Sequence, residues 1–110
     1  MLLVAVLEDR AAATFPGKNG RIAFVSDRSG HDEIYTMNAK NGSGLTQLTN
    51  QPTGGRDPSY SPNGKKIVFA SFRSGNFEIY TMNAKNGSGL TQLTHNPADD
   101  FDADWGVRVR

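Results

Sequence analysis

Acidic and apolar residues alternate near the C-terminus, and this pattern is the clearest chemical signal in the chain. The carboxylates are those of Asp100, Asp102 and Asp104, and the apolar residues that alternate with them are Phe101, Ala103 and Trp105. An extended strand with this alternation would send the carboxylates to one face and the apolar side chains to the other. Clustered carboxylates suit a hard cation such as Ca²⁺, or an acidic ring that meets a basic partner. The alternative interpretation is a solvated strand edge with turn-capping aspartates.

Other chemistry-bearing residues do not assemble into a recognisable catalytic set. His31 and His95 have no Ser, Cys or second His at ligand spacing, so we expect both on surface loops. The sequence contains no G-x-S-x-G, phosphate loop, H-E-x-x-H or C-x-x-C. Because no nucleophile, base and orienting partner can be named together, we predict no enzymatic activity, no catalytic residue and no cofactor besides the cation considered above.

The sequence that positions these residues repeats itself. The segment Glu33–Thr49 recurs without a change as Glu78–Thr94, an offset of 45 residues. The similarity extends upstream to Ile22 and Ile67 and downstream to the prolines at 52 and 97. A module of ~45 residues has the length of one four-stranded propeller blade and is longer than helical repeats of 33–34 residues.

We interpret the residues that recur in both copies as structural residues. We expect core packing for the pairs Tyr35/Tyr80 and Met37/Met82, and an Arg–Glu contact across each hairpin for Arg28 with Glu33 and Arg73 with Glu78. The Asn-Gly-Ser triplets at 41–43 and 86–88 formally match a glycosylation acceptor, but we expect Gly-rich hairpin turns there.

Turn residues divide the second copy into four short strands. Ser61-Pro62-Asn63-Gly64, Arg73-Ser74-Gly75-Asn76 and Asn86-Gly87-Ser88-Gly89 mark the turns. The expected strands are therefore 57–61, 66–71, 78–83 and 90–94. Residues 67–70 are apolar on both faces, as in a strand between neighbouring blades, whereas 90–94 mixes in polar groups as an outermost strand should.

The motifs in these turns and strands resemble a known family. Tyr60-Ser61-Pro62-Asn63-Gly64, the run Arg73–Asn83 and Leu90-Thr91-Gln92-Leu93-Thr94 are similar to the WD40-like repeat of the TolB type (PD40). The resemblance covers nearly everything from Phe15 onward, with Tyr60 for Trp, Asn63 for Asp, and residues 106–109 in place of a third turn motif. It implies a six-bladed periplasmic propeller that serves as a protein-binding platform.

The fold class expected is therefore all-β, a propeller of four-stranded antiparallel blades with two blades in the chain. Closed propellers need about four to eight blades, so two blades leave apolar faces and strand edges open. The chain either assembles with copies of itself, three copies giving the six blades of the resembling family, or is a piece of a longer protein. We predict a non-enzymatic, self-assembling scaffold, with another protein as a candidate partner at the channel mouth. The alternative is a propeller fragment of a larger hydrolase or ligand-binding protein.

The expected modules are blade 1 at 15–55, blade 2 at 56–100, and the inner strand of a following blade at 101–110. By the 45-residue period, Phe101–Trp105 aligns with Arg56–Tyr60, which puts Trp105 in the place of Tyr60. This spare strand would complete the first blade of the next chain, whose own candidate inner strand near Phe15 is weak. The alternative is a boundary cut inside a blade. Residues 1–14 are expected to be an apolar arm or a signal-peptide remnant.

Composition limits the class of partner. Twelve basic and 11 acidic residues give a net charge of +1, which argues against nucleic acid. No apolar stretch approaches the ~20 residues that span a bilayer. The absence of cysteine removes disulfides and thiolate sites. The apolar start and the family resemblance together favour an extracytoplasmic location.

Overall fold

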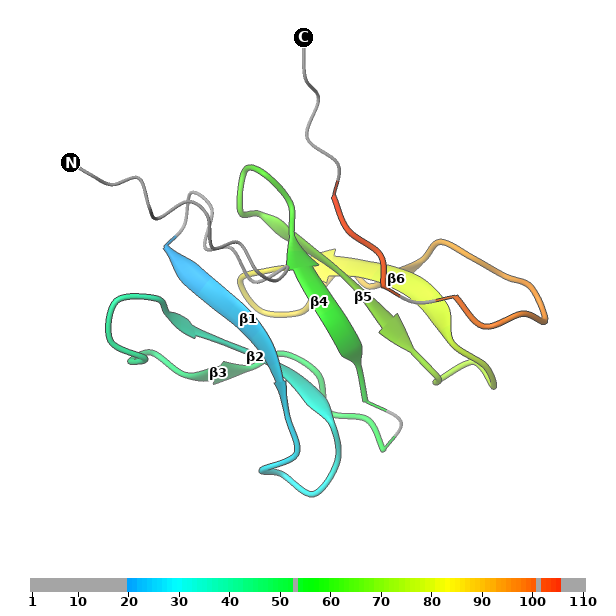
Figure 1. The fold of residues 1–110 in the computed structure, drawn as a ribbon, viewed down its shortest axis with the longest axis horizontal. Coiled ribbons are helices and arrows are strands. Elements are labelled where there is room, and N and C mark those ends of the chain that lie inside the picture. The colour runs from blue at the N-terminus through cyan, green and yellow to red at the C-terminus, as the bar shows by residue number, and fades with distance from the viewer. Residues whose placement is uncertain (1–19, 53, 101, 106–110) are drawn as a thin grey trace, which may run out of the picture.

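The computed structural model describes residues 20–52, 54–100 and 102–105, which form seven strands in two antiparallel sheets and contain no helix (Figure 1). The first sheet has the order β1-β2-β3 and the second the order β4-β5-β6-β7. The strands are β1 (Arg21–Ser26), β2 (Glu33–Asn38), β3 (Thr46–Gln47), β4 (Arg56–Tyr60), β5 (Lys66–Ser71), β6 (Glu78–Asn83) and β7 (Thr91–Gln92). The family expectation of an all-β, antiparallel fold is confirmed for these residues.

Equivalent turns join equivalent strands in the two sheets. The β1–β2 turn closes with a hydrogen bond from the Gly30 N–H to the Asp27 carbonyl, and the β5–β6 turn with the same bond from Gly75 to Phe72. Gly30 and Gly75 have φ values of 109° and 111°, which few side chains tolerate, so glycine is required at this point. The shared Arg-Ser-Gly sequence of the two turns agrees with the same register in both hairpins.

The strands expected at 66–71 and 78–83 form as predicted, whereas the outermost one is shorter. Leu90–Thr94 was expected to be extended, but only Thr91 and Gln92 pair with β6. Beyond them the Thr94 hydroxyl accepts a hydrogen bond from the Ile79 N–H, which takes the place of a strand carbonyl. A side-chain acceptor thus ends the ladder early.

The first strand of the second sheet is irregular. Pairing of β4 with β5 shifts between Arg56 and Ser59, a β-bulge next to Pro58. Proline lacks an N–H and is tolerated at such a bulge on an edge strand. Asp57 within the bulge has a φ of 54°, so it leaves the extended conformation.

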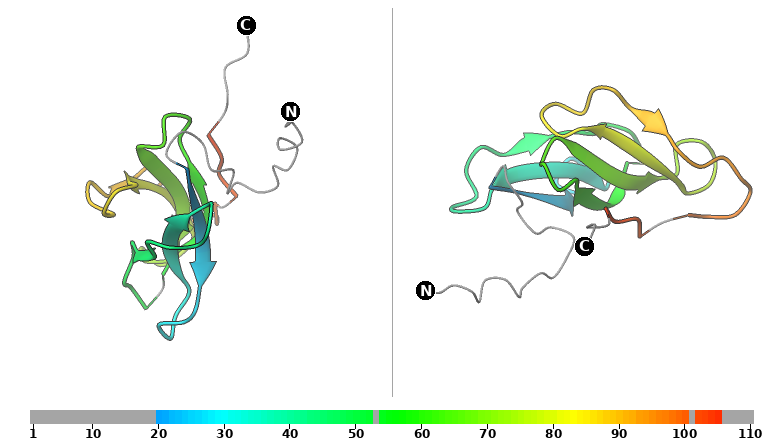
Figure 2. Two further views of the ribbon diagram at one scale, coloured as in Figure 1. Left: turned by 90° about the vertical axis from the view of Figure 1, so that its left-hand side faces the viewer. Right: turned by 90° about the horizontal axis from the view of Figure 1, so that it is seen from above.

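The two sheets pack face to face, with β4 next to β1 and β2 (Figures 1 and 2). We call this contact the seam. Its core combines Ala23 and Ile34 of the first sheet with Ile67, Phe69 and Met82 of the second. Both tyrosines predicted to be core residues, Tyr35 and Tyr80, are buried, as is Met82, while Met37 is half-buried. His31 and His95 are exposed on loops, as predicted.

The predicted Arg–Glu contact across each hairpin is wrong. Arg28 instead lies over the rings of Phe24 and Tyr35, and its Nε–H donates to the Ser26 hydroxyl at 2.8 Å. Glu33 accepts hydrogen bonds from the Thr49 hydroxyl and the Gln51 N–H. The recurring arginine and glutamate of the hairpin therefore have other partners than each other. The described part of the chain contains no helix with the length and apolar character needed to span a bilayer.

Candidate functional site

The C-terminal segment lies against β4, the first strand of the second sheet. The Trp105 indole N–H donates to the Ser59 carbonyl at 3.0 Å, and the Ser59 hydroxyl donates to the Asp104 carboxylate at 2.7 Å. Tyr60, the residue equivalent to Trp105, is buried in β4 itself. Residues 102–105 therefore lie against β4. Phe101, residues 1–14 and Phe15 lie outside the described residues.

Residues 102–105 do not form the regular strand that the alternation suggested. Asp102 has a φ of 63°, which interrupts the extended backbone. Asp102 and Asp104 are exposed, whereas Ala103 and Trp105 are half-buried, so the apolar side of the pattern still packs inward. The regular strand is therefore not formed, because left-handed backbone at Asp102 breaks the extended conformation, whereas one common face for the three carboxylates stays a prediction.

Two of the three carboxylates accept hydrogen bonds from different side chains. Asp100 accepts a hydrogen bond from the Asn96 side-chain amide at 2.9 Å, and Asp104 accepts the bond from Ser59. Among the described residues no group of three His, Cys, Asp or Glu side chains is placed to hold a metal ion. A cation site formed by the carboxylates of several chains stays a prediction.

Asp102 instead faces the equivalent residue of the preceding module, Asp57. Burial raises the pKa of Asp57, and the neighbouring charge and side chain of Asp102 raise it further. Both residues have positive φ, at 54° and 63°. Asp and Asn are the non-glycine residues that adopt this conformation most readily. Two equivalent carboxylates of successive modules thus lie close together.

The open face of the second sheet carries an acidic hollow of about 440 Å³, lined by Ile79, Thr94, Asp99, Asp100 and Asp102. Ile79, the apolar residue that lines this hollow, is equivalent to Ile34, which is fully buried in the seam. Gly55, equivalent to Asp100, lies where an added Cβ would stand 2.9 Å from Ile34 Cγ1 and 3.1 Å from Phe69 Cδ2. The hollow therefore marks the place where, in the seam, the next sheet inserts an aromatic ring.

The opposite face, on the first sheet, presents a cation on an aromatic pair. Phe24 and Tyr35 stack at 5.8 Å, and the exposed Arg28 guanidinium lies 5.5 Å and 5.1 Å from their ring centres. In the second sheet, Arg73 covers Phe69 and Tyr80 in the same way, but this face is buried in the seam.

Within the seam, Arg73 is close enough to Glu33 of the first sheet to interact with its charge. Burial lowers the pKa of Arg73, and the charges of Tyr80 and Glu33 oppose that change. Arginine remains protonated throughout the accessible pH range. The recurring Arg and Glu are therefore related across neighbouring modules. Sequence reasoning missed this relationship because it compared residues within a hairpin.

The recurring glutamate organises the end of each sheet. Glu78 accepts hydrogen bonds from the Thr94 hydroxyl, the Asn96 N–H and the Asn76 amide. These bonds, that of Thr94 first, lower the pKa of Glu78 against the effect of burial. In the first sheet, Glu33 accepts the equivalents of the first two bonds, from the Thr49 hydroxyl and the Gln51 N–H. This glutamate has a structural role, which its recurrence in the sequence suggested.

Comparisons with known proteins agree with this architecture. A family model, the TolB beta propeller domain (PD40), matches residues 6–108. A solved structure assigned as TolB from Agrobacterium tumefaciens is 28% identical with a TM-score of 0.67, and the alignment covers 74% of this chain and 29% of that one. TolB from Acinetobacter baumannii is 28% identical with a TM-score of 0.61, covering 74% of this chain and 20% of that one. No curated protein matches the chain.

The chain thus spans less than a third of the length of either solved TolB chain. The family match, in contrast, includes both sheets and the segment that follows them. The repeat, the antiparallel sheets, the family model and the solved structures agree, and the chain belongs to the TolB beta propeller domain family.

Proposed function

We propose that this chain is a non-enzymatic β-propeller scaffold whose ring is closed by further copies of itself, three copies giving six blades, outside the cytoplasm. Each chain contributes blade 1 (15–55), blade 2 (56–100) and the inner strand of a following blade (101–110). That strand completes the first blade of the next copy. The completed ring offers its channel mouth to a partner protein.

One comparison within the chain carries the proposal. Leu48 is 9% exposed, whereas Leu93, in an identical stretch of sequence, is 53% exposed. Ile34 and Thr36 are likewise fully buried, and their equivalents Ile79 and Thr81 are not. The difference arises because the second sheet covers the first, and nothing among the described residues covers the second to the same extent. The second sheet therefore presents a face already built to receive a sheet like its own.

The first sheet has the complementary face. Phe24 is half-buried and Arg28 exposed, while of their equivalents in the seam Phe69 is fully buried and Arg73 half-buried. Suppose that the first sheet of a second copy packs on the second sheet as the second sheet packs on the first. Phe24 of that copy would then meet the acidic hollow, and its Arg28 would meet Glu78. The charges are of opposite sign, and such complementarity fixes orientation and register. Because the two faces lie on opposite sides of the chain, the contact is head-to-tail and can close a ring.

The position of Trp105 supports the same geometry. Its segment already contacts β4 through the Ser59 carbonyl and hydroxyl. A neighbouring first sheet placed next to it would add three strands to this inner segment. The resulting four-stranded blade would be shared by two chains.

Native mass measured on matched variants tests the proposal. Leu93→Asp places a charge on the receiving face and is expected to convert a three-chain species into monomer. Leu90→Asp makes the same change at a leucine that is 44% exposed and whose equivalent, Leu45, stays 47% exposed beside the seam. That control variant should remain trimeric. Both positions are exposed, so circular dichroism should show that both variants fold.

A wild-type monomer whose mass and melting do not respond to Leu93→Asp would overturn self-assembly. That outcome would favour the second candidate, a propeller fragment of a larger hydrolase or ligand-binding protein. The observation in favour of this candidate is the coverage of the solved TolB chains, at 29% and 20%.

The ring would bring one set of inner aspartates from each chain toward the channel. We propose these carboxylates, those of Asp100, Asp102 and Asp104, as its cation site, with Ca²⁺ as the cation. Calorimetric titration of Ca²⁺ into the assembled protein should give saturable heat. A heat-silent titration, with melting unchanged by a chelator, would eliminate the site.

A further inference from the structure

The two identical turns at 41–43 and 86–88 both contain asparagine followed by glycine, which is the least stable sequence context for asparagine. Glycine has no Cβ, so nothing hinders the attack of its backbone nitrogen on the asparagine side chain. Asn41-Gly42 and Asn86-Gly87 both lie inside the unchanged repeat, so the residues that flank them are the same. Any difference in reactivity between the two asparagines must therefore come from the fold.

The hydrogen bonds that close the two turns are equivalent. The glycine N–H donates to a carbonyl at the start of each turn, from Gly42 to Asn38 at 2.9 Å and from Gly87 to Asn83 at 2.8 Å. Both asparagine side chains are exposed, so water reaches both. Because the attacking nitrogen is engaged in a hydrogen bond, the reaction requires the turn to open first. The rate of the reaction then follows the free energy of this local opening.

Only the second turn rests on another sheet. An added Cβ on Gly87 would stand 2.5 Å from the Leu48 carbonyl oxygen, so this glycine lies directly on the backbone of the first sheet. Among the described residues, an added Cβ on Gly42 would meet only the Met37 sulfur of its own hairpin, at 3.7 Å. The second turn must therefore break packing at the seam in order to open, whereas the first turn does not.

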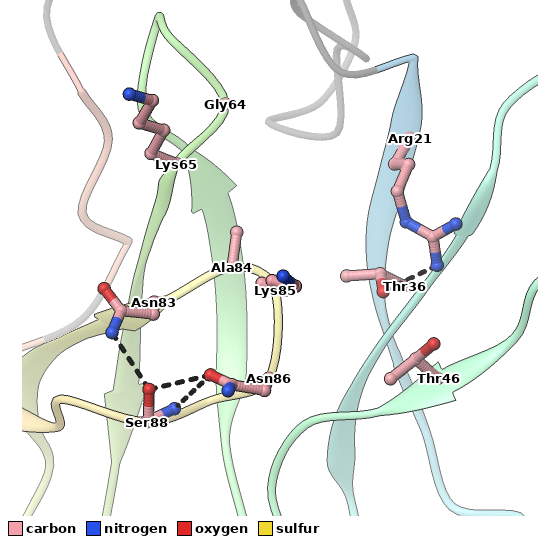
Figure 3. Close-up of a pocket in the computed structure, with 10 residues that line it drawn as sticks. All are labelled: Arg21, Thr36, Thr46, Gly64, Lys65, Asn83, Ala84, Lys85, Asn86 and Ser88. Atoms are coloured by element: carbon pink, nitrogen blue, oxygen red, sulfur yellow. Dashed lines mark hydrogen bonds between the residues drawn. The ribbon is translucent and has the colours of Figure 1, made fainter.

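The asparagine of the second turn also has an additional hydrogen bond. Its Oδ1 accepts from the Ser88 N–H at 3.1 Å and from the Ser88 hydroxyl at 2.7 Å. Figure 3 shows these bonds beside a hollow between the two sheets, with Thr36 and Thr46 of the first sheet on the other side. Among the described residues, Asn41 Oδ1 accepts only from the Ser43 N–H, at 3.0 Å. Both differences favour opening of the first turn.

Two further Asn-Gly pairs occur in the chain, at 19–20 and 63–64. Asn19 lies outside the described residues. Asn63 Oδ1 accepts hydrogen bonds from the Ser61 hydroxyl at 2.8 Å and the Lys65 N–H at 2.9 Å, and Gly64 is buried. We therefore expect Asn63 to react as slowly as Asn86.

We propose that Asn41 is a site of spontaneous deamidation in the free chain, and that covering its turn suppresses the reaction. The Gly42 nitrogen forms a bond to Asn41 Cγ, and the bond from Cγ to the side-chain nitrogen breaks. That nitrogen leaves as ammonia, with the proton of the Gly42 N–H. The cyclic succinimide then adds water and opens to isoaspartate or aspartate. Water is the only co-reactant, and nothing is oxidised or reduced.

The link between this reaction and assembly rests on the proposed ring. In that ring, Gly42 of one copy would lie on the Leu93 carbonyl of another, as Gly87 lies on the Leu48 carbonyl within the chain. Isoaspartate puts an extra methylene group into the main chain and adds a carboxylate, so a modified turn would no longer fit this surface. Closure of the ring therefore protects Asn41, and modification of a free chain prevents closure.

Peptide mapping by mass spectrometry on the Leu93→Asp variant, the expected monomer, tests the proposal. Cleavage after Lys40 and Lys85 releases peptides 41–56 and 86–108, which begin with the two asparagines and differ in mass. In the folded variant Asn41 should be converted about tenfold faster than Asn86, the scale of one additional hydrogen bond together with packing. In guanidinium chloride the two should react at equal rates, because their flanking residues are the same.

Three results would overturn the proposal. Equal conversion of the two asparagines in the folded variant, or faster conversion of Asn86, would show that the seam does not protect its turn. Unequal conversion in guanidinium chloride would show that the fold is not the cause of the difference. Fast conversion of Asn41 in a wild type whose native mass is that of the ring would show that closure does not cover the turn.

Native mass separates this proposal from that of the ring. A wild type that assembles should convert Asn41 as slowly as Asn86, which supports both proposals. A monomeric wild type that converts Asn41 as fast as the Leu93→Asp variant would overturn the ring and support the modification site.

Discussion

Asp57 and Asp102 hold the same position in successive modules, and each stands in the left-handed region of backbone conformation, with φ of 54° and 63°. The proximity of the two carboxylates, added to burial, raises the pKa of Asp57. In the proposed ring, the same contact would recur between each pair of neighbouring inner strands. It is also the point at which the alternation rule fails, since left-handed backbone interrupts an extended strand.

The Asp57 carboxyl predicts a pH-dependent gain in stability. Because its pKa is raised on folding, its contribution is fully present below the ordinary value of 3.8 and is lost as pH rises through the raised pKa. Asp57→Asn should therefore stabilise the protein at pH 7, by on the order of 0.5 kcal/mol for a partly exposed pair. Asparagine also accepts positive φ. Thermal melts at pH 7 and pH 3 should show the gain only at pH 7, and Asp27→Asn on the exposed turn should show none.

Glu78 predicts the opposite dependence on pH. Its pKa is lowered, chiefly by the Thr94 hydroxyl, so its contribution is present above the ordinary value of 4.5 and is lost as pH falls through the lowered pKa. Glu78→Gln should destabilise the protein at pH 7 and have little effect at pH 2. The measurement is urea unfolding across that range. An equal loss at both pH values would show that packing, not charge, accounts for the role of Glu78.

The equivalent network in the first sheet predicts the effect of a single hydroxyl. Thr49 donates to Glu33 at 2.6 Å and accepts from the Ile34 N–H at 2.9 Å, and all three residues are buried. Thr49→Val keeps the shape and removes both bonds, so the free energy of unfolding should fall by about 2–3 kcal/mol. Thr49→Ser keeps the hydroxyl and should lose less. Chemical denaturation compares the two, and equal losses would contradict the hydrogen-bond explanation.

The repeat made the strands predictable, because two copies of one module must fold alike. Glu78–Asn83 and Lys66–Ser71 formed where turn residues placed them. The outermost strand was overestimated because Thr94 uses its hydroxyl as a backbone acceptor, which a strand pattern does not reveal. Arg28 and Glu33 were misassigned to one another because a period identifies equivalent residues without saying which module holds the partner.

The residues of the candidate site could be predicted from the sequence better than their arrangement in space. The alignment of Trp105 with Tyr60 did not indicate which element of its own chain the indole would contact; in the structure its N–H donates to the Ser59 carbonyl of β4. The charge interaction of Arg73 with Glu33 had no sequence signal, since the two residues are 40 positions apart in the chain and come together only at the seam. Residues that different modules contribute to one site become neighbours only through packing, so a linear pattern does not bring them together.

Trp105 gives the final prediction, because it is the only tryptophan in the chain and reports on closure directly. It is half-buried against β4, with its indole N–H donated to the Ser59 carbonyl. In the proposed propeller ring, the first sheet of a neighbouring chain would cover the rest of the indole. The fluorescence emission of Trp105 should therefore be blue-shifted and should move to the red on dilution.

Trp105→Ala should cost about 2 kcal/mol per site, because burial and a hydrogen bond are lost, and this cost should be observed as weaker assembly. Removal of residues 99–110 should abolish assembly while both copies of the 17-residue repeat remain. Emission that does not change with concentration, together with an unchanged native mass after the truncation, would show that this segment belongs to its own chain alone.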